Sequence, residues 1–307
     1  MNVTRLAPAA VLIALVLAIA ALSPSFLSAY SLRVLAAESS VILLLATGQT
    51  LVVLGGGIDL SVAALASLTS ILLALLLEDI GAVAILLALG VATLAGALQG
   101  WVHVRAKIPS FIVTLAGLGL WSGVALGFAE TTVPVTGSFE AVGWLTAQTA
   151  AVPNAFLLAV AVLALFQLAL LRLPIGRRLV AVGLGERAAL MSGVRVGRVK
   201  TLAFAASGFC AGLAGVVLVA RSGSGNPTIA DSLLLPSIAA VLLGGTAITG
   251  GHGSLVRTFL GVGIIGVLRV GIAITGVAPA WEPIAYGVLI VAAVALTVDR
   301  RAFGVVK

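Results

Sequence analysis

Charged residues are scarce in this chain of 307 residues. Asp, Glu, Lys and Arg together make up 9% of it, whereas hydrophobic residues make up 61%. Soluble domains contain about 25% charged residues, so the composition excludes a soluble globular protein. Apolar runs recur from end to end at about the 20-residue length that a helix needs to cross a bilayer. The sequence therefore predicts an integral membrane protein.

Residues that carry catalysis or bind metals are scarce as well. The single cysteine, Cys210, cannot form an internal disulfide. The two histidines, His103 and His252, lie far apart without metal-ligand spacing. The chain contains neither a GxSxG nucleophile elbow nor the GxxxxGK[ST] loop that binds ATP phosphates. The sequence thus predicts a non-catalytic chain with no metal and no bound cofactor.

We predict an all-α integral membrane protein with a single membrane domain over residues 1–307 and about ten transmembrane helices. The alternating pattern of a membrane barrel is absent. The predicted spans are 7–22, 37–55, 58–77, 80–102, 110–129, 153–171, 201–220, 234–250, 255–275 and 281–298. The first span could instead be a cleaved signal peptide, but a retained helix keeps an even number of spans, which agrees better with the charges.

The positions of Lys and Arg predict the orientation, because short loops rich in these residues stay cytoplasmic. With the N-terminus inside, the cytoplasmic basic residues are Arg5, Arg105, Lys107, the seven of residues 172–200, Arg257, Arg300, Arg301 and Lys307. Arg33, Arg221 and Arg269 are exceptions. Both termini are therefore predicted to be cytoplasmic. Since topology accounts for the net charge of +7, no nucleic-acid partner is predicted.

Two segments, VVLGGGIDLSVAALASL (52–68) and AVLLGGTAITGGHGSLV (240–256), share a pattern. Each has an apolar run, a double glycine, a small polar cluster and then a new span. Transporters are often built from two repeats, and glycine-interrupted segments at corresponding positions mark the permeation pathway. The pattern predicts related halves of about 37–171 and 201–298.

Ionisable groups are almost absent from the middle of the spans. Asp59 and Arg269 come nearest, and both lie close to a helix end. A secondary carrier would need such groups at depth, where each is costly to insert. Their absence indicates that the driving energy comes from another subunit. Asp59 itself has two interpretations, a substrate or gate contact and a cap for the helix that begins near Leu60, and we favour the cap.

Residues 172–200, RLPIGRRLVAVGLGERAALMSGVRVGRVK, form the only long charge-dense stretch. Its basic residues are Arg172, Arg177, Arg178, Arg187, Arg195, Arg198 and Lys200. A short helix is predicted from Glu186 to Ser192, with Glu186 in the first turn, where the helix dipole favours an acid, and with Gly193 ending it. This loop suits docking into a groove on a cytoplasmic partner, although the arginines could serve only to fix the topology.

Four blocks of sequence carry a family resemblance. They are GQTLVVLGGGIDLSVAALASLTS (48–70), KIPSFIVTLAG (107–117), GRRLVAVGLGERAALMSGVRVGRVK (176–200) and IAAVLLGGTAITGGHGS (238–254). In this order they resemble the permease subunit of bacterial ABC importers, in the branch that handles ribose, xylose and similar simple sugars. Two departures are Pro236, in a segment where relatives usually carry acids, and His252, where they usually carry a basic residue.

The resemblance implies a set of partners and a place in the cell. Two permease chains, identical or related, would form the pathway in the bacterial inner membrane, surrounded by membrane lipid. A cytoplasmic ABC ATPase would use ATP and magnesium, and a periplasmic sugar-binding protein would deliver the sugar. Residues implied in ATPase coupling are Gly176, Arg177, Ala181, Gly183, Glu186, Ala188, Ala189, Ser192 and Gly193. Residues implied in the glycine-broken pathway segments are Gly56, Gly57, Asp59, Leu60, Ser61, Gly244, Gly245, Thr246, Gly250, Gly251 and Gly253.

Uncharged polar residues within the spans are further pathway candidates. They are Thr47, Gln49, Thr50, Gln99 and Thr114, which either line a sugar path or form hydrogen bonds between helices. The importer could also belong to the branched-chain amino acid or nucleoside branch, or the chain could be a stand-alone ion-coupled carrier. An amino acid would need partners for its two charges, and no charge at mid-span offers them.

Overall fold

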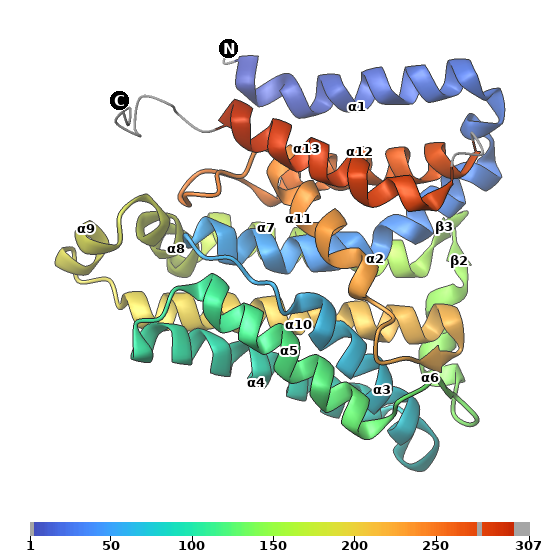
Figure 1. Cartoon of the computed structure of the whole chain (residues 1–307), viewed down its shortest axis with the longest axis horizontal. Coiled ribbons are helices and arrows are strands. Elements are labelled where there is room, and N and C mark those ends of the chain that lie inside the picture. The colour runs from blue at the N-terminus through green and yellow to red at the C-terminus, as the bar shows by residue number, and fades with distance from the viewer. Residues whose placement is uncertain (1–2, 275–277, 298–307) are drawn as a thin grey trace.

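The computed structural model describes residues 3–274 and 278–297, and helices dominate it (Figure 1). The α-helices are α1 (Val3–Leu22), α2 (Ala29–Leu54), α3 (Val62–Ile80), α4 (Val83–Ala106), α5 (Ser110–Phe128), α6 (Glu140–Gly143), α7 (Asn154–Arg172), α8 (Pro174–Leu184), α9 (Glu186–Met191), α10 (Val196–Ser222), α11 (Leu234–Leu243), α12 (Leu255–Ile274) and α13 (Glu282–Thr297). The 3-10 helices are η1 (Pro24–Leu27), η2 (Trp144–Thr146), η3 (Asp231–Leu233) and η4 (Pro279–Trp281). The predicted all-α membrane fold is confirmed in class.

Seven of the described helices are long and apolar enough to cross a membrane. They are α2, α3, α4, α5, α7, α10 and α12. Shorter apolar helical stretches at Ala7–Leu22, Asp231–Leu243 and Glu282–Val291 occupy the other three predicted spans. The count of ten spans and the cytoplasmic termini stay predictions. Arg300, Arg301, Lys307 and the predicted span ends at 275 and 298 lie outside the described residues.

Two predicted span limits are wrong because glycine-rich backbone interrupts the helix. The span predicted at 58–77 begins as a helix only at Val62, after a nonhelical segment of residues 55–61. The span predicted at 234–250 ends at Leu243. Gly245, Gly250 and Gly251 have φ angles of 78°, 88° and 72°, which belong to the left-handed region and cannot continue an α-helix.

The centre of the fold is the pair α2 and α10, with most residues of both helices buried. At Gly48 of α2 a Cβ atom would lie 2.8 Å from the Cα of Ser207 on α10. On the other side of α10, a Cβ at Gly96 of α4 would lie 2.3 Å from the Phe204 carbonyl oxygen, and one at Gly208 would lie 2.2 Å from that of Ala92. Small residues let helix backbones approach this closely, and such contact drives association in lipid.

The two ends of the molecule differ (Figure 1). At one end lie α8 and α9, and α9 projects beyond the other helices. At the opposite end lie α6 and two short antiparallel pairs. The pairs join β1 (Val133–Pro134) with β4 (Ser224–Gly225), and β2 (Gln148–Thr149) with β3 (Val152–Pro153). Only these eight residues are strand in the described part of the chain.

A second nonhelical segment folds back into the helices after α10. Ser70 of α3 donates to the Asn226 carbonyl and accepts from the Asn226 amide, both at 3.1 Å. Ser67 of α3 accepts from the Ala230 amide at 3.1 Å. Residues 226–230 therefore run beside α3, and serine side chains satisfy backbone groups that lipid could not. The sequence analysis did not predict this segment.

Candidate translocation and coupling site

Three glycine-containing segments far apart in the sequence meet beside α8. The Gly251 amide donates to the Leu54 carbonyl at the end of α2, at 2.9 Å. A Cβ at Gly183 of α8 would lie 1.9 Å from that carbonyl oxygen and 2.3 Å from the Gly251 nitrogen. A Cβ at Gly250 would lie 2.8 Å from the Gly56 Cα. We call this contact of Leu54, Gly56, Gly183, Gly250 and Gly251 the glycine junction.

The glycine junction connects two groups of predicted residues. Both predicted pathway loops, after α2 and after α11, contribute to it, and Gly183 belongs to the predicted coupling segment. Because every contact is made by backbone, any side chain at Gly183 would separate the three segments. The helix α8 therefore packs directly against the loops that join α2 to α3 and α11 to α12.

Asp59 is fully buried and lies in a hydrogen-bonded network just beyond the junction. Its Oδ1 accepts from the Ser61 amide at 3.0 Å and the Ser61 hydroxyl at 2.6 Å. Its Oδ2 accepts from the Ser207 hydroxyl on α10 at 2.8 Å. Ser61 in turn accepts from Gln99 Nε2 on α4 at 3.0 Å. The segment before α3 is therefore tied to α4 and α10 by polar side chains.

The helix cap proposed for Asp59 is wrong in its position. The helix α3 begins at Val62 rather than near Leu60, and its N-cap residue is Ser61, whose side chain makes no capping bond. Asp59 binds the Ser61 amide, two residues on, which is an Asx turn before the helix. The bond to Ser207 adds a contact between distant helices that local capping rules do not contain.

The α5 side of the same segment is held by two further polar residues. The Ile58 amide donates to Ser110 Oγ at 3.0 Å, and Thr114 donates to the Ile58 carbonyl at 3.2 Å. Gly57 also fits closely, since a Cβ there would lie 3.0 Å from Val52 Cγ1 and 3.4 Å from Ser110 Oγ. Thr114 and Gln99 thus form hydrogen bonds between segments. This was one of the two roles predicted for them, the other being to line a sugar path.

The other polar pathway candidates divide into bonded and unbonded groups. Thr47 donates to the Leu43 carbonyl, and Thr50 to that of Ala46, with the Thr258 hydroxyl 2.8 Å away. Gln49 Nε2, Gln99 Oε1 and Thr246 Oγ1 are buried atoms of these candidates without a hydrogen-bond partner in the described part of the chain. Buried polar atoms are rarely left unpaired. Gln49, Gln99 and Thr246 therefore each keep an unpaired polar atom, and their place in the pathway stays a prediction.

The remaining pathway glycines shape the loop between α11 and α12. A Cβ at Gly244 would lie 2.6 Å from the Arg257 carbonyl oxygen, and one at Gly253 would lie 2.6 Å from Thr246 Oγ1. Gly245 is more open, with Arg257 Nη1 at 3.8 Å as its nearest contact. These contacts explain the density of glycine in the loop, because the backbone here packs directly against α12 and against itself.

The short helix predicted from Glu186 to Ser192 is confirmed as α9, Glu186–Met191, while its role in coupling stays a prediction. Gly193 has a φ angle of 78°, and its amide donates to the Leu190 carbonyl at 3.0 Å, as expected of a helix stop. Glu186 Oε2 binds Lys200 Nζ at 2.7 Å. Lys200 is nearly buried and also lies 3.4 Å from His103 Nε2 of α4. The sequence did not predict this connection from α9 to α4 and α10.

Residues 174–184, left without a helix in the sequence analysis, form α8. The signal was present, because Pro174 stands at the first helical position and Gly185 follows the end. The buried residues Gly176, Leu179 and Val182 recur at helical spacing. A Cβ at Gly176 would lie 2.1 Å from the Leu170 carbonyl oxygen, so the turn from α7 into α8 requires glycine.

The predicted coupling residues occupy different positions on α8 and α9. Gly176 and Ala189 are buried, and Ala181 and Gly183 are half-buried. The exposed ones are Arg177, Glu186, Ala188, Ser192 and Gly193. Three large apolar side chains are exposed beside them, Leu184, Leu190 and Met191, and Met191 is 88% exposed. An exposed apolar patch with a polar rim marks an interaction surface.

A network of charged residues missed as a site lies at the opposite end. Glu38 of α2 pairs with Arg221 of α10 and, at 3.6 Å, with Arg269 of α12. Arg269 also lies 3.7 Å from Glu282 of α13. The signal in the sequence was the failure of Arg221 and Arg269 to fit the orientation rule. Each arginine pairs with the partially buried carboxylate of Glu38, and this pairing explains how α10 and α12 carry a positive charge at this end.

A cavity of about 300 Å³ adjoins these charges. Glu38, Arg221, Arg269, Ser222 and Ser232 are among the residues that line it. None of the predicted pathway residues lines this cavity. It can offer several hydrogen-bonding groups to a polar solute, whereas Gln49 and Thr246 lie elsewhere.

Comparisons with known proteins agree with the four resembling blocks. A family profile described as "Branched-chain amino acid transport system / permease component" matches residues 31–294. The ribose import permease of Bacillus subtilis (strain 168) is 35% identical over 97% of this chain and 93% of its own length. The fructose import permease of Rhizobium meliloti is 33% identical, over 94% and 85%. The D-allose transport system permease of Escherichia coli (strain K12) is 31% identical, over 93% and 89%.

No solved structure is similar enough to add to this comparison. The family match covers most of the chain and includes both glycine loops, α8 and α9. Three of the relatives over 30% identical are named as permeases for simple sugars. This chain belongs to the family of branched-chain amino acid transport system permease components, and within it is similar to the import permeases for ribose, fructose and allose.

Proposed function

We propose that this chain is the membrane permease subunit of an ABC importer for a monosaccharide or related polyol. The observation that carries the proposal is the glycine junction, where Gly183 of α8 contacts the loops after α2 and α11. An outside force on α8 and α9 would move both loops and, through them, α3 and α12. The names of the relatives supply the class of solute.

The proposed ATPase contact is the end of the molecule formed by α8 and α9. Leu184, Leu190 and Met191 offer exposed apolar contacts. Arginines at the same end supply positive charge for an acidic rim on the partner. The ATPase would hold ATP and magnesium, while this chain, which has no phosphate-binding loop, would be non-catalytic.

The remaining features of the importer follow from that assignment. The α8–α9 end would be cytoplasmic, as would both termini, with ten spans in the bacterial inner membrane. A second permease chain, identical or related, would complete the pathway. The opposite end, with its charged network and polar cavity, would receive the sugar from a periplasmic binding protein.

A branched-chain amino acid is the second candidate solute, because the matching family profile carries that description. Its ammonium and carboxylate groups would each need an oppositely charged partner. Asp59 already accepts three hydrogen bonds from Ser61 and Ser207. Glu38, Arg221 and Arg269 are paired with acids or bases of their own. A neutral sugar fits these groups better, since its hydroxyls do not require a free charge.

The test is uptake by vesicles that contain this chain with its ATPase and binding protein. We expect ATP-dependent uptake of a labelled monosaccharide, no uptake of leucine, and no uptake when the ATPase is omitted. Uphill accumulation from an ion gradient without ATPase would contradict the proposal.

The coupling segment is tested by Glu186→Lys. This change places a second ammonium group against the nearly buried Lys200 and should abolish transport while the protein stays in the membrane. Arg105→Glu, which reverses a charge at an exposed site on α4 outside the coupling segment, is the control. Equal transport by the two variants would remove α9 from the coupling mechanism.

A further inference from the structure

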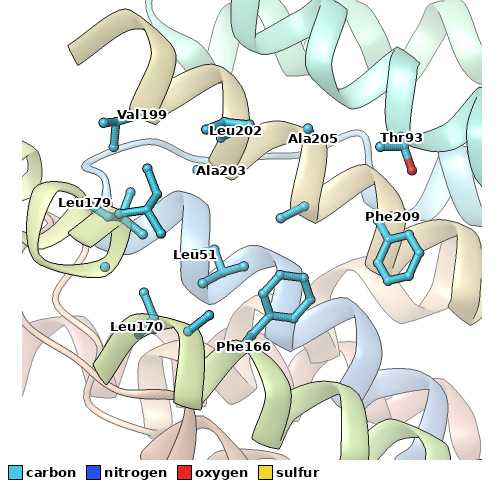
Figure 2. Close-up of a pocket in the computed structure, with 14 residues that line it drawn as sticks. Leu51, Thr93, Phe166, Leu170, Leu179, Val199, Leu202, Ala203, Ala205 and Phe209 are labelled. Carbon is cyan, nitrogen blue, oxygen red and sulfur yellow. The ribbon is translucent and has the colours of Figure 1, made fainter. Parts of the chain in front are cut away.

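An apolar groove lies between α7, α8 and α10, with α2 at its base (Figure 2). Its volume is about 390 Å³. Figure 2 shows Phe166 and Leu170 entering from α7, Leu51 from α2, and Leu202 and Phe209 on the α10 side. This groove is separate from the glycine junction and from the charged network at the opposite end.

The chemistry of the lining excludes a sugar as the occupant. Among the lining residues, Thr93 has the only polar side chain, and its hydroxyl donates to the Leu89 carbonyl at 2.7 Å. A sugar in the groove would lose its hydrogen bonds to water and find no replacement. The lining therefore fits an apolar occupant.

The shape of the groove suits a chain that lies along the helices. Its α10 wall extends from Val199 to Phe209, which at the rise of an α-helix is about 15 Å. Leu202 on its rim is exposed, as are Leu165 and Leu168 of α7. In a membrane these exposed leucines face lipid. The groove is thus open to lipid along its side, and Leu179 of α8 forms one end.

Three arginines lie within two residues, along the chain, of residues that line the α8 end of the groove. Arg178 directly precedes the lining residue Leu179, Arg198 directly precedes Val199, and Arg172 ends α7. All three are exposed, and no carboxylate of the described residues lies within ion-pair distance of them. Glu186, the only acid between residues 172 and 200, pairs with Lys200. This end of the groove is complementary to an anion.

We propose that the groove holds one acyl chain of an anionic phospholipid, whose phosphate lies against Arg172, Arg178 and Arg198. Clusters of basic residues beside membrane helices bind anionic headgroups, and each arginine near the surface strengthens binding about fivefold. The apolar wall accounts for the chain, and the unpaired arginines account for the headgroup. The lipid would fill the space between α8 and the bundle, and so would support the helix that carries Gly183.

The first experiment compares lipid headgroups on the intact protein. The purified protein is exposed to equal amounts of phosphatidylglycerol and phosphatidylcholine with the same acyl chains, and bound lipid is counted by native mass spectrometry. We expect retention of about one phosphatidylglycerol per chain and at least tenfold less phosphatidylcholine. Equal retention of the two lipids would overturn the headgroup assignment.

Two variants then test the position. Ala206→Trp fills the groove from α10 and should release the bound phosphatidylglycerol. Leu165→Trp adds the same ring to an exposed position on α7 outside the groove and should leave the bound lipid unchanged. The paired change Arg178→Gln with Arg198→Gln should weaken phosphatidylglycerol retention more than tenfold. Arg187→Gln, on α9 away from the lining, should not.

Each outcome decides for or against the site. Retention of phosphatidylglycerol by folded Ala206→Trp protein would place the lipid elsewhere. A change in oligomeric mass in that variant, with bound lipid unaltered, would assign the groove to a second protein chain. If Ala206→Trp does not fold, the headgroup comparison and the arginine pair still decide. The inference requires that α7 and α10 cross a membrane but not that the solute is a sugar, so these measurements are independent of transport.

Discussion

The glycine junction makes Gly183→Ala the most informative single substitution. The new methyl group would lie 1.9 Å from the Leu54 carbonyl oxygen and 2.3 Å from the Gly251 nitrogen. Ordinary carbon contacts are about 3.5–4.0 Å, so backbone must move by more than an ångström. Neither neighbour is a flexible side-chain end that could rotate away. The substitution must therefore separate α8 from one or both loops.

The cost can be estimated from two contributions. Overpacking a tight site costs about 1–3 kcal/mol, and loss of the bond from the Gly251 amide to the Leu54 carbonyl costs a further ~1 kcal/mol. An energy of this size disfavours the assembled junction at least tenfold. We expect sugar uptake driven by the ATPase to fall by at least that factor, while the chain still inserts into the membrane.

The matched control is Gly185→Ala, two residues further along. Gly185 has an extended φ angle of 178°, which any residue adopts, and a Cβ there would meet only Ala188 Cβ, at 3.7 Å. Alanine at this N-cap position costs less than about 1 kcal/mol. Uptake by proteoliposomes and the melting temperature in detergent are measured for both variants. Indistinguishable values for Gly183→Ala and Gly185→Ala would refute the assignment of a tight coupling contact.

Two further predictions concern the helices around α10. Gly96→Leu should lower the melting temperature strongly, because its Cβ would lie 2.3 Å from the Phe204 carbonyl oxygen. Overpacking of this kind costs about 1–3 kcal/mol. The control Gly90→Leu, at a position with open space around it, should leave the melting temperature unchanged. Asp59→Ala should destabilise the protein by about 1–3 kcal/mol, because the buried donors of Ser61 and Ser207 lose their acceptor. This loss of stability should exceed that of Ser207→Ala, which removes only one of the three bonds. Equal losses in the two variants would show that the Ser61 bonds contribute little.

Much of the fold could be predicted from local patterns. Each span predicted from hydropathy contains a helix in the structure. Hydropathy succeeds because the free energy of transferring a side chain into lipid depends mainly on that side chain alone. Capping chemistry predicted α9 and its stop at Gly193, since both depend on residues within one or two turns. The sequence signal for α8 was equally local, since Pro174 and Gly185 stand at its two ends. The sequence prediction missed it because the segment was interpreted by its charges and not by the spacing of its apolar residues.

Local patterns did not reveal which segments meet. The sequence singled out the glycines near Gly56 and Gly250 as pathway segments, which stays a prediction, and related them as repeats and not as neighbours. The sequence likewise contained Asp59 and Ser207 without their hydrogen bond across 148 positions. Such contacts depend on how closely two backbones approach, and that distance is set by every small residue between them.

The amino-acid sequence alone determined that this is a helical membrane protein of a permease family, and it predicted that a basic segment meets a partner. The tertiary structure alone decided that α8 contacts both glycine loops, that Asp59 joins α10, and that Glu38 pairs with Arg221 and Arg269. The physical reason is the distance along the chain over which each interaction acts. Hydrophobicity and capping act on single residues or single turns, whereas coupling and charge pairing require groups that only the packed helices bring together.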